Sequence, residues 1–529
     1  METTVSRTGA EVRKWWVLAV MSVGTLIIFL DNTVVNTALP AISVDLEAST
    51  STLQWVIDSY VLILAGLLLL GGSIGDRFGR KRWMIIGLVI FGAGAVAGAL
   101  AGSATELIVA RGIQGLGAAL VLPATLSIIT NVFPRGERAR AIAIWTAVGA
   151  LGIGVGPALG GYLVDEAGWA SVFWLHVPVV AVALVGMLIV PRSRDERGLR
   201  LDVPGAVLGT TGLIALVYGI IQGSEAGWMS AEILGSFGVA VALLTAFAVA
   251  ELRSDHPMLP LRFFRQKDFT GAVLAIGLIL FGMLVTFFFL TQFFQIVQGR
   301  SALEAGLLIV PTSLAMMFAA PLSGTLVSKI GPRYLVLAMA LAMVTGVLLL
   351  TSLEVGSSAL AAVIPLTIFG FGAGLGMPAL TDTVMAAVPE EDAGIGSAVN
   401  DVSRELGGAL GIATIGSVVS SLYRANIDDA LVGLPPDVAE LAGESVGVAA
   451  IAAQQLPAEL GGSVLEAANT AFVDAMTTGF QISAAILLMA VVIAFTLIPR
   501  RMRAVQAEVE EDAPAPVFGS ELIPEAAPA

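Results

Sequence analysis

The residues of this chain that could do chemistry are a few ionisable side chains placed inside long apolar stretches. Asp31, Asp58 and Arg111 are the main three. A charged group near the middle of a bilayer costs about 3 kcal/mol on insertion scales, so it marks a functional site by default. At about 1.5 Å per helical residue, all three lie roughly 8–14 Å below the same membrane surface. We therefore predict that they form one cluster.

A cluster of carboxyl and guanidinium groups can bind and release a proton. Apolar surroundings favour the protonated form of a carboxyl group, whereas a nearby guanidinium favours the carboxylate. We predict that Asp31 is the principal proton or cation site, that Arg111 is its modulating partner and that Asp58 is auxiliary. Two alternatives stay open: Asp31 and Arg111 form a static ion pair between helices, and Asp58 is merely hydrated near a helix end.

Membrane-spanning helices are the elements that would position these residues. The chain is 57% hydrophobic and 13% charged, whereas about a quarter of the residues of a soluble domain are charged. A helix of about 20 apolar residues crosses the hydrocarbon core, so we predict an all-α polytopic membrane protein with 14 transmembrane helices. The apolar stretches are 16–38, 52–71, 84–102, 107–131, 141–163, 171–190, 204–222, 231–250, 269–291, 303–327, 334–352, 359–387, 395–421 and 477–498.

The basic residues predict the orientation of these helices. Of the 27 Lys and Arg residues, 23 lie in alternate gaps between the apolar stretches. The positive-inside rule then places both termini in the cytoplasm. Only the cytoplasmic gap 389–393 has no basic residue, and it carries Glu390, Glu391 and Asp392 instead. The excess of Arg over Lys is typical of GC-rich bacteria, so we expect a multi-pass protein of the bacterial cytoplasmic membrane.

An internal repeat predicts the domain organisation. Segments 72–81 and 324–333 are similar, lie 252 residues apart and each follow the second helix of a six-helix set. Parallel halves of this kind enclose a central cavity. The predicted parts are an N-terminal six-helix bundle (1–190), a two-helix insert with cytoplasmic linkers (191–267), a C-terminal six-helix bundle (268–505) with an acidic external loop (424–475), and a disordered acidic tail (506–529).

Several motifs carry a family resemblance. Segment 72–82 resembles the signature turn of the major facilitator superfamily. Segment 30–40 resembles the first-helix motif of its fourteen-span drug:proton antiporters, the EmrB/QacA-like branch, and segments 111–115, 149–161 and 404–408 match the same branch. The resemblance implies the major facilitator fold and transport by alternating access.

The signature turn is a candidate inner gate. Its residues are Gly72, Asp76, Arg77, Gly79, Arg80 and Lys81. Asp76 can interact with the positive N-terminal end of a facing helix, and the family pattern makes that helix 395–421. Pairing of Arg80 or Lys81 with the acids at 390–392 would latch the gate. The alternative is that the basic residues only determine topology.

Glycines of stretch 141–163 form a second motif. Gly152, Gly156 and Gly160 recur every fourth residue, so they leave a stripe on which another helix can pack closely. Pro157 bends the helix. Together with Gly149 these residues resemble the antiporter motif of the family, which implies exchange rather than symport. Close packing without directional meaning is the alternative.

Two further sets are candidates of a less specific kind. Asp382, Asp401, Arg404 and Glu405 form a predicted second buried charge set, either a C-terminal proton route or structural compensation of Arg404. Phe288, Gln292 and Gln295 are possible substrate contacts, although a lipid-facing aromatic belt would explain the phenylalanines equally well.

These features predict a proton-coupled secondary transporter that exports amphipathic drugs, cationic ones among them, or toxic small molecules. An exporter of an endogenous metabolite, antibiotic or lipid is the alternative, and an importer or a membrane-embedded enzyme is less favoured. The chain has no cysteine, and its two histidines, His176 and His256, lie far apart in sequence, so we expect no metal centre and no cofactor beyond the proton gradient. The net charge of −14 argues against a nucleic-acid partner. The expected partners are a small-molecule substrate, protons and the lipid bilayer, and we expect a monomer.

Overall fold

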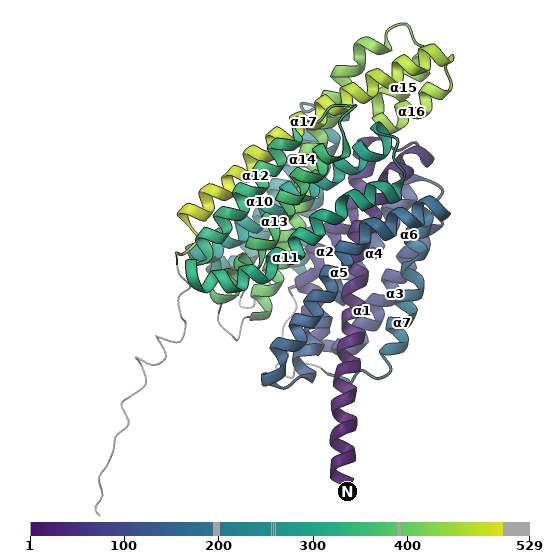
Figure 1. The fold of residues 1–529 in the computed structure, drawn as a ribbon. Coiled ribbons are helices and arrows are strands. Elements are labelled where there is room, and N and C mark those ends of the chain that lie inside the picture. The colour runs from purple at the N-terminus through teal and green to yellow at the C-terminus, as the bar shows by residue number, and fades with distance from the viewer. Residues whose placement is uncertain are drawn as a thin grey trace, which may run out of the picture.

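The computed structural model is helical throughout the part of the chain that it describes, which comprises residues 2–193, 202–254, 257, 259, 261–388 and 393–500. Figure 1 shows long helices gathered side by side, with the first helix projecting at one end. Long apolar segments form helices because a helix satisfies every backbone N–H and C=O within the segment itself, which lipid cannot do. The predicted tail 506–529 and the acids at 390–392 lie outside the described residues.

The helices follow one another with short connections. In chain order they are α1 (Glu2–Asp45), α2 (Thr50–Phe78), α3 (Arg80–Ala99), α4 (Ala104–Val132), α5 (Arg135–Ala167), α6 (Ala170–Trp174), α7 (His176–Gly186), α8 (Val203–Ala226), α9 (Ala231–Arg253), η1 (Leu261–Arg265), α10 (Lys267–Gln292), η2 (Phe293–Val297), α11 (Ala302–Ile330), α12 (Pro332–Leu350), α13 (Ala359–Ala386), α14 (Ala393–Leu431), α15 (Pro436–Glu444), α16 (Val446–Gln454) and α17 (Ala458–Thr496).

The number of membrane-spanning helices differs from the prediction. Within the described residues, 12 helices are long and apolar enough to cross a membrane, against 14 predicted. Helix α5 is not among the 12. The predicted stretch 171–190 is divided between α6, which ends at Trp174, and α7. The apolar segment that these two helices form, Ala170–Gly186, is shorter than a full span. The structure therefore shows a multi-pass membrane protein with 12 candidate spans.

The internal repeat is visible in the packing. Helix α1 packs on α5, and α2 and α3 pack on α4; in the second half α10 packs on α14, and α11 and α12 pack on α13. The two groups, α1–α7 and α10–α17, meet where α5 lies along α11 and α2 lies along α14. These two contacts are equivalent under the repeat, so the groups are related by an approximate two-fold axis. Helices α8 and α9 pair with each other, and α8 also packs on α2 and α14.

The segment predicted as an external loop, 424–475, is helical instead. Helix α14 runs on to Leu431, α15 and α16 follow, and α17 begins at Ala458. Val438 and Ala442 are buried, as are Val446 and Ala449, because apolar residues recur at helical spacing and build a small core. In Figure 1, α15 and α16 project from the end of the bundle opposite the N-terminus, which we call the distal end. The acidic residues lie on its surface: Asp428, Asp429, Glu440, Glu459, Glu466 and Asp474 are exposed.

Candidate functional site

The centre of the candidate site is an ion pair between α1 and α4. The Arg111 guanidinium donates through Nη1 to Asp31 Oδ2 at 2.7 Å. The two side chains are 0% and 1% exposed. The structure therefore brings together the two residues that the sequence places at one depth, in surroundings where an unpaired charge would be costly.

Arg111 is held by α2 as well as by Asp31. Its Nε donates to the Val56 carbonyl at 3.1 Å, and its Cζ lies 4.2 Å from the centroid of the Tyr60 ring. Helix α4 approaches α2 this closely because Gly115, one turn after Arg111, touches the Tyr60 carbonyl, where any side chain would collide. The guanidinium is thus fixed against α2, and Asp31 is the partner carried by another helix.

Two residues that sequence reasoning did not select complete the surroundings of Asp31. Gln114 accepts a hydrogen bond from Arg111 Nη1 at 2.9 Å and donates to Asp31 Oδ1 at 3.5 Å. His176 Nε2 of α7 lies 3.4 Å from the same Oδ1, and its side chain is 0% exposed. His176 had a signal, since it is an ionisable residue inside an apolar stretch, but its separation from His256 was used only to argue against a histidine-based metal or acyl-transfer centre.

Asp58 lies apart from this pair. Its carboxyl group is buried on α2, and neither oxygen has a hydrogen-bond partner in the described part of the chain. Gln54, one turn earlier on the same face of the helix, donates to the Ile412 carbonyl of α14 at 2.9 Å. The predicted single cluster of three residues is therefore a pair, with Asp58 separate from it on the face of α2 that meets α14.

The glycine stripe of α5 packs on α1. A Cβ at Gly152 would lie 3.1 Å from the Leu26 carbonyl, and one at Gly156 would collide with the Thr33 side chain. Gly149 meets Phe29 and Gly160 meets Val34 in the same way. The stripe thus receives the stretch of α1 on either side of Asp31. Since successive helical residues are about 100° apart, Asp31 points away from this contact, toward α4 and α7.

The other side of α5 binds α11 at the distal end. Gly306 of α11 touches the Pro157 carbonyl, and Gly161 touches the Ala302 carbonyl. Asp165 accepts hydrogen bonds from the backbone N–H groups of Ala302 and Leu303, both at 2.9 Å. A carboxylate at the first turn of a helix is favourable because it satisfies free N–H groups there. Helix α5 therefore connects α1 to the second helix group, a role that sequence reasoning gave only to its glycines.

The signature turn is built as a compact hydrogen-bonded corner. Asp76 accepts from Arg80 Nε at 2.6 Å and from Ser127 Oγ of α4 at 3.1 Å. Gly79, with φ of 109°, joins α2 directly to α3. Lys81 donates to the Val190 carbonyl at 2.7 Å.

Among the described residues, the predicted contact of Asp76 with α14 is not seen. The bonds of Asp76 remain within α1–α7, and the predicted acids at 390–392 lie outside the described residues. Of the remaining members, Gly72 lies against Pro123, and the Arg77 guanidinium lies over the Phe78 ring.

The predicted second charge set is looser than expected. Asp401, Arg404 and Glu405 are only half-buried on α14, and Asp382 of α13 is exposed. No salt bridge joins Arg404 to either acid within the described residues. Asp401 instead accepts from the Asn400 amide at 3.3 Å. Arg404 and Glu405 are adjacent on the helix and point about 100° apart, so the two acids can balance the charge of Arg404 without bonding to its guanidinium.

The aromatic stretch after residue 286 is inside the protein. Phe288 is fully buried and packs edge-on against Phe289, with ring centroids 4.9 Å apart. Gln292 is also buried, and Gln295 donates to the Thr37 carbonyl of α1 at 2.9 Å. The lipid-facing interpretation of Phe288 is thus wrong, and Gln295 joins the two helix groups.

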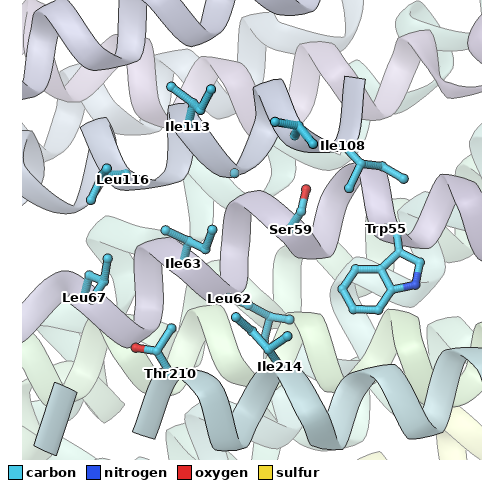
Figure 2. Close-up of a pocket in the computed structure, with 12 residues that line it drawn as sticks. Trp55, Ser59, Leu62, Ile63, Leu67, Ile108, Ile113, Leu116, Thr210 and Ile214 are labelled. Carbon is cyan, nitrogen blue, oxygen red and sulfur yellow. The ribbon is translucent and has the colours of Figure 1, made fainter. Parts of the chain in front are cut away.

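An apolar groove lies between α2, α4 and α8. It has a volume of about 580 Å³. Figure 2 shows Trp55, Ile63 and Ile214 among its lining side chains, with Ser59 and Thr210 as its few polar groups. Val109 and Ile113 on its rim are exposed large hydrophobic residues. The groove offers apolar contact and lies outside the charged site.

Comparison with known proteins defines the class. The family model of the Major Facilitator Superfamily matches residues 21–412, so the chain belongs to this superfamily of membrane transporters. A bacterial homologue of the human lysosomal transporter Spinster, in an inward-facing and unoccupied conformation, shares the fold, with a TM-score of 0.63, 18% identity and coverage of 92% of this chain and 98% of that one.

Sequence relatives narrow the class to drug resistance and efflux proteins. The chain is 37% identical to the multidrug resistance protein Stp of Mycobacterium tuberculosis over 79% of this chain and 78% of Stp. It is 34% identical to the multidrug efflux pump LfrA of Mycolicibacterium smegmatis over 93% and 97% of the two chains. It is 32% identical to the tetracenomycin C resistance and export protein of Streptomyces glaucescens over 92% of each.

Proposed function

We propose that this protein exports amphipathic drugs or toxic small molecules across the bacterial cytoplasmic membrane in exchange for protons. The observation that carries the proposal is the fully buried pair of Asp31 and Arg111, one member on each of two helices. Relatives that are named for multidrug efflux and for resistance to tetracenomycin C support the substrate class.

The geometry suggests how the pair couples a proton to movement. While Arg111 donates to Asp31, the two groups form a pair without net charge. A proton bound by Asp31 removes its negative charge and weakens its attachment to α4. Helix α5 packs on α1, and its Asp165 caps the first turn of α11. Release of Asp31 therefore lets α1 and α5 shift together against α4. Loading a cationic substrate near Asp31 favours the ionised carboxyl group and so expels the proton.

The hydrogen bonds between the two helix groups indicate which state is present. They gather at the distal end, where Thr291 donates to Asn36, Gln295 donates to the Thr37 carbonyl and Asp165 caps α11. At the opposite end, Lys14 pairs with Glu137 of α5, which belongs to the same group. We infer a conformation that is closed at the distal end. The positive-inside rule makes that end external, so we infer an inward-facing state.

The finer topology follows from the same assignment. Helix α5 and the divided segment α6–α7 occupy the places of a fifth and a sixth crossing in the repeat, so we propose 14 crossings with both termini in the cytoplasm. Asp58 is an auxiliary proton site, and the acids of α14 serve mainly to compensate Arg404. The protein acts as a monomer without a cofactor.

Export of a lipid or a lipid-like metabolite is the second candidate. The apolar groove between α2, α4 and α8 favours it, because the exposed apolar rim gives access from the bilayer. An uncharged compound taken from the membrane would enter there by apolar contact alone.

A susceptibility panel tests the proposed function. Cells lacking their own efflux pumps express the wild-type chain, Asp31→Asn or the control Asp429→Asn, which alters an exposed acid on α14. We expect wild type and the control to raise resistance to several amphipathic cations at least about fourfold, and Asp31→Asn to raise none at equal membrane abundance, because its site cannot ionise. Equal resistance from all three proteins would refute the assignment.

A further inference from the structure

We propose that His176 is a proton-carrying residue of the Asp31 site, a third member beside Arg111. This inference rests on the proposed proton-coupled function and assigns the proton a path that the paired aspartate alone does not supply.

His176 lies beside the Asp31 carboxyl group. Its Nε2 lies 3.4 Å from Asp31 Oδ1, the oxygen that the Arg111 ion pair leaves open. Asp31 is therefore approached by Arg111 on one oxygen and by His176 and Gln114 on the other. A neutral imidazole donates from one nitrogen and accepts at the other, so it can receive a proton on one side and pass one to a carboxylate on the other.

Among the described residues, Asp31 and Arg111 are the only charged groups close to His176. Helix α7 packs on α1, α3 and α6. From α3 it meets the Phe91 ring edge-on, with centroids 5.5 Å apart, and α6 contributes no ionisable residue. The basic residues of α3 begin that helix, about 14 Å along from Phe91. Tyr60 of α2 stacks on Arg111, on the other side of the pair.

Charge balance explains why a third group is useful. The ion pair is neutral, and a proton that enters gives the buried set one net positive charge. If Asp31 received it directly, the pair with Arg111 would weaken at the moment the proton binds. With His176 present, Nδ1 takes the proton and the Nε2–H faces Oδ1 while Arg111 remains on Oδ2. Transfer then breaks the N–H bond and forms the O–H bond, and only that step releases Arg111.

The test observes the imidazole itself. Full-length protein carrying His256→Gln, which leaves His176 as the one histidine, is labelled with ¹³C,¹⁵N-histidine, reconstituted in lipid vesicles and titrated by magic-angle-spinning NMR between about pH 5 and about pH 9. We expect an imidazolium signal to appear on acidification. In Asp31→Asn the midpoint should fall by at least about one pH unit, a tenfold weaker proton affinity, because Arg111 then acts without its counter-charge.

The matched control is Asp76→Asn, which makes the same chemical change at the signature turn and should leave the midpoint unchanged. A neutral imidazole over the whole range, or equal midpoints with and without Asp31, would overturn the inference. Because the spectrum reports proton binding rather than transport, a protein that titrates as expected yet exports nothing would refute the proposed function alone.

Discussion

Arg111 is the residue on which the candidate site depends most. It donates to Asp31, to the Gln114 side chain and to the Val56 carbonyl, and its guanidinium lies over Tyr60. A planar group with five fixed donors can satisfy all of these at once, which an ammonium group cannot. The arginine is therefore anchored to α2 and α4, so changes in the pair must come from Asp31 on α1.

A charge-neutral double variant separates a coupling pair from a structural one. Arg111→Gln leaves a buried carboxyl group without its partner, and we expect it to lower stability by about 3–5 kcal/mol. Asp31→Asn combined with Arg111→Gln should recover most of that loss but no transport. Unfolding in detergent and efflux in cells provide the two measurements. Recovery of transport by the double variant would show that the pair only holds helices together.

At this scale the sequence predicted the pair but not its neighbours. Asp31 and Arg111 could be selected because a charge in an apolar stretch is costly and needs a reason. His176 was harder to select, since a neutral imidazole is tolerated in such a stretch. Asp58 has the same type and depth as Asp31, yet it faces α14, and only the rotation of α2 decides that. Helix rotation follows from packing, which spacing alone does not determine.

Helix α5 is one of the elements that connect the site to the second half of the molecule. Its glycines receive α1 on one side, and its Pro157 backbone and Asp165 bind α11 on the other. We propose that a displacement of α11 is transmitted through α5 to the helix that carries Asp31, which would give the glycine motif a mechanical role.

Substitution of one glycine by alanine tests this role. A Cβ at Gly156 would collide with Thr33, whereas one at Gly154 on the same helix would meet Ser313 at an ordinary 3.5 Å. Forcing an atom into a packed contact costs about 1–3 kcal/mol. We expect Gly156→Ala to reduce the efflux rate at least about tenfold and Gly154→Ala to keep it near the wild-type value, measured as dye efflux at matched expression. Equal rates for the two would show that α1 and α5 need not stay in close contact.

The sequence predicted where most helices lie better than how they pack and where they end. The spacing of Gly152, Gly156 and Gly160 predicted a packing stripe, but not that α1 would fill it. The acidic composition of 424–475 suggested a solvated loop, whereas its buried Val438 and Ala442 form helices with acids on their outer faces. The acidic composition reflects only the surface of this segment, and the helical spacing of its apolar residues was the signal for helices.

The two helix groups, α1–α7 and α10–α17, have the same packing arrangement. The signature turn and its copy 252 residues later predicted this, and the packing pairs repeat in the same order. The copy lacks the acid, with Ser328 where Asp76 stands, and its helix group has no ion pair like that of Asp31 and Arg111 within the described residues. A symmetric scaffold thus carries an asymmetric site.

The proposed topology can be checked because the chain has no cysteine, so each introduced thiol is unique. Asp429 at the distal end and Arg192 beyond α7 are both exposed. We expect a membrane-impermeant maleimide to label Asp429→Cys in intact cells, and Arg192→Cys only after the membrane is opened, as the positive-inside rule requires. Labelling of Arg192→Cys from outside would reverse the assignment of the distal end.

Exchange of a proton for substrate at the buried Asp31 can be measured directly. Both flows are followed together in vesicles that contain the protein and a pH-sensitive dye, with a compound to which its expression confers resistance. We expect a substrate gradient to drive protons the opposite way in the wild-type protein and to move none in Asp31→Asn. Proton movement per substrate molecule in Asp31→Asn equal to that of the wild type would contradict this expectation.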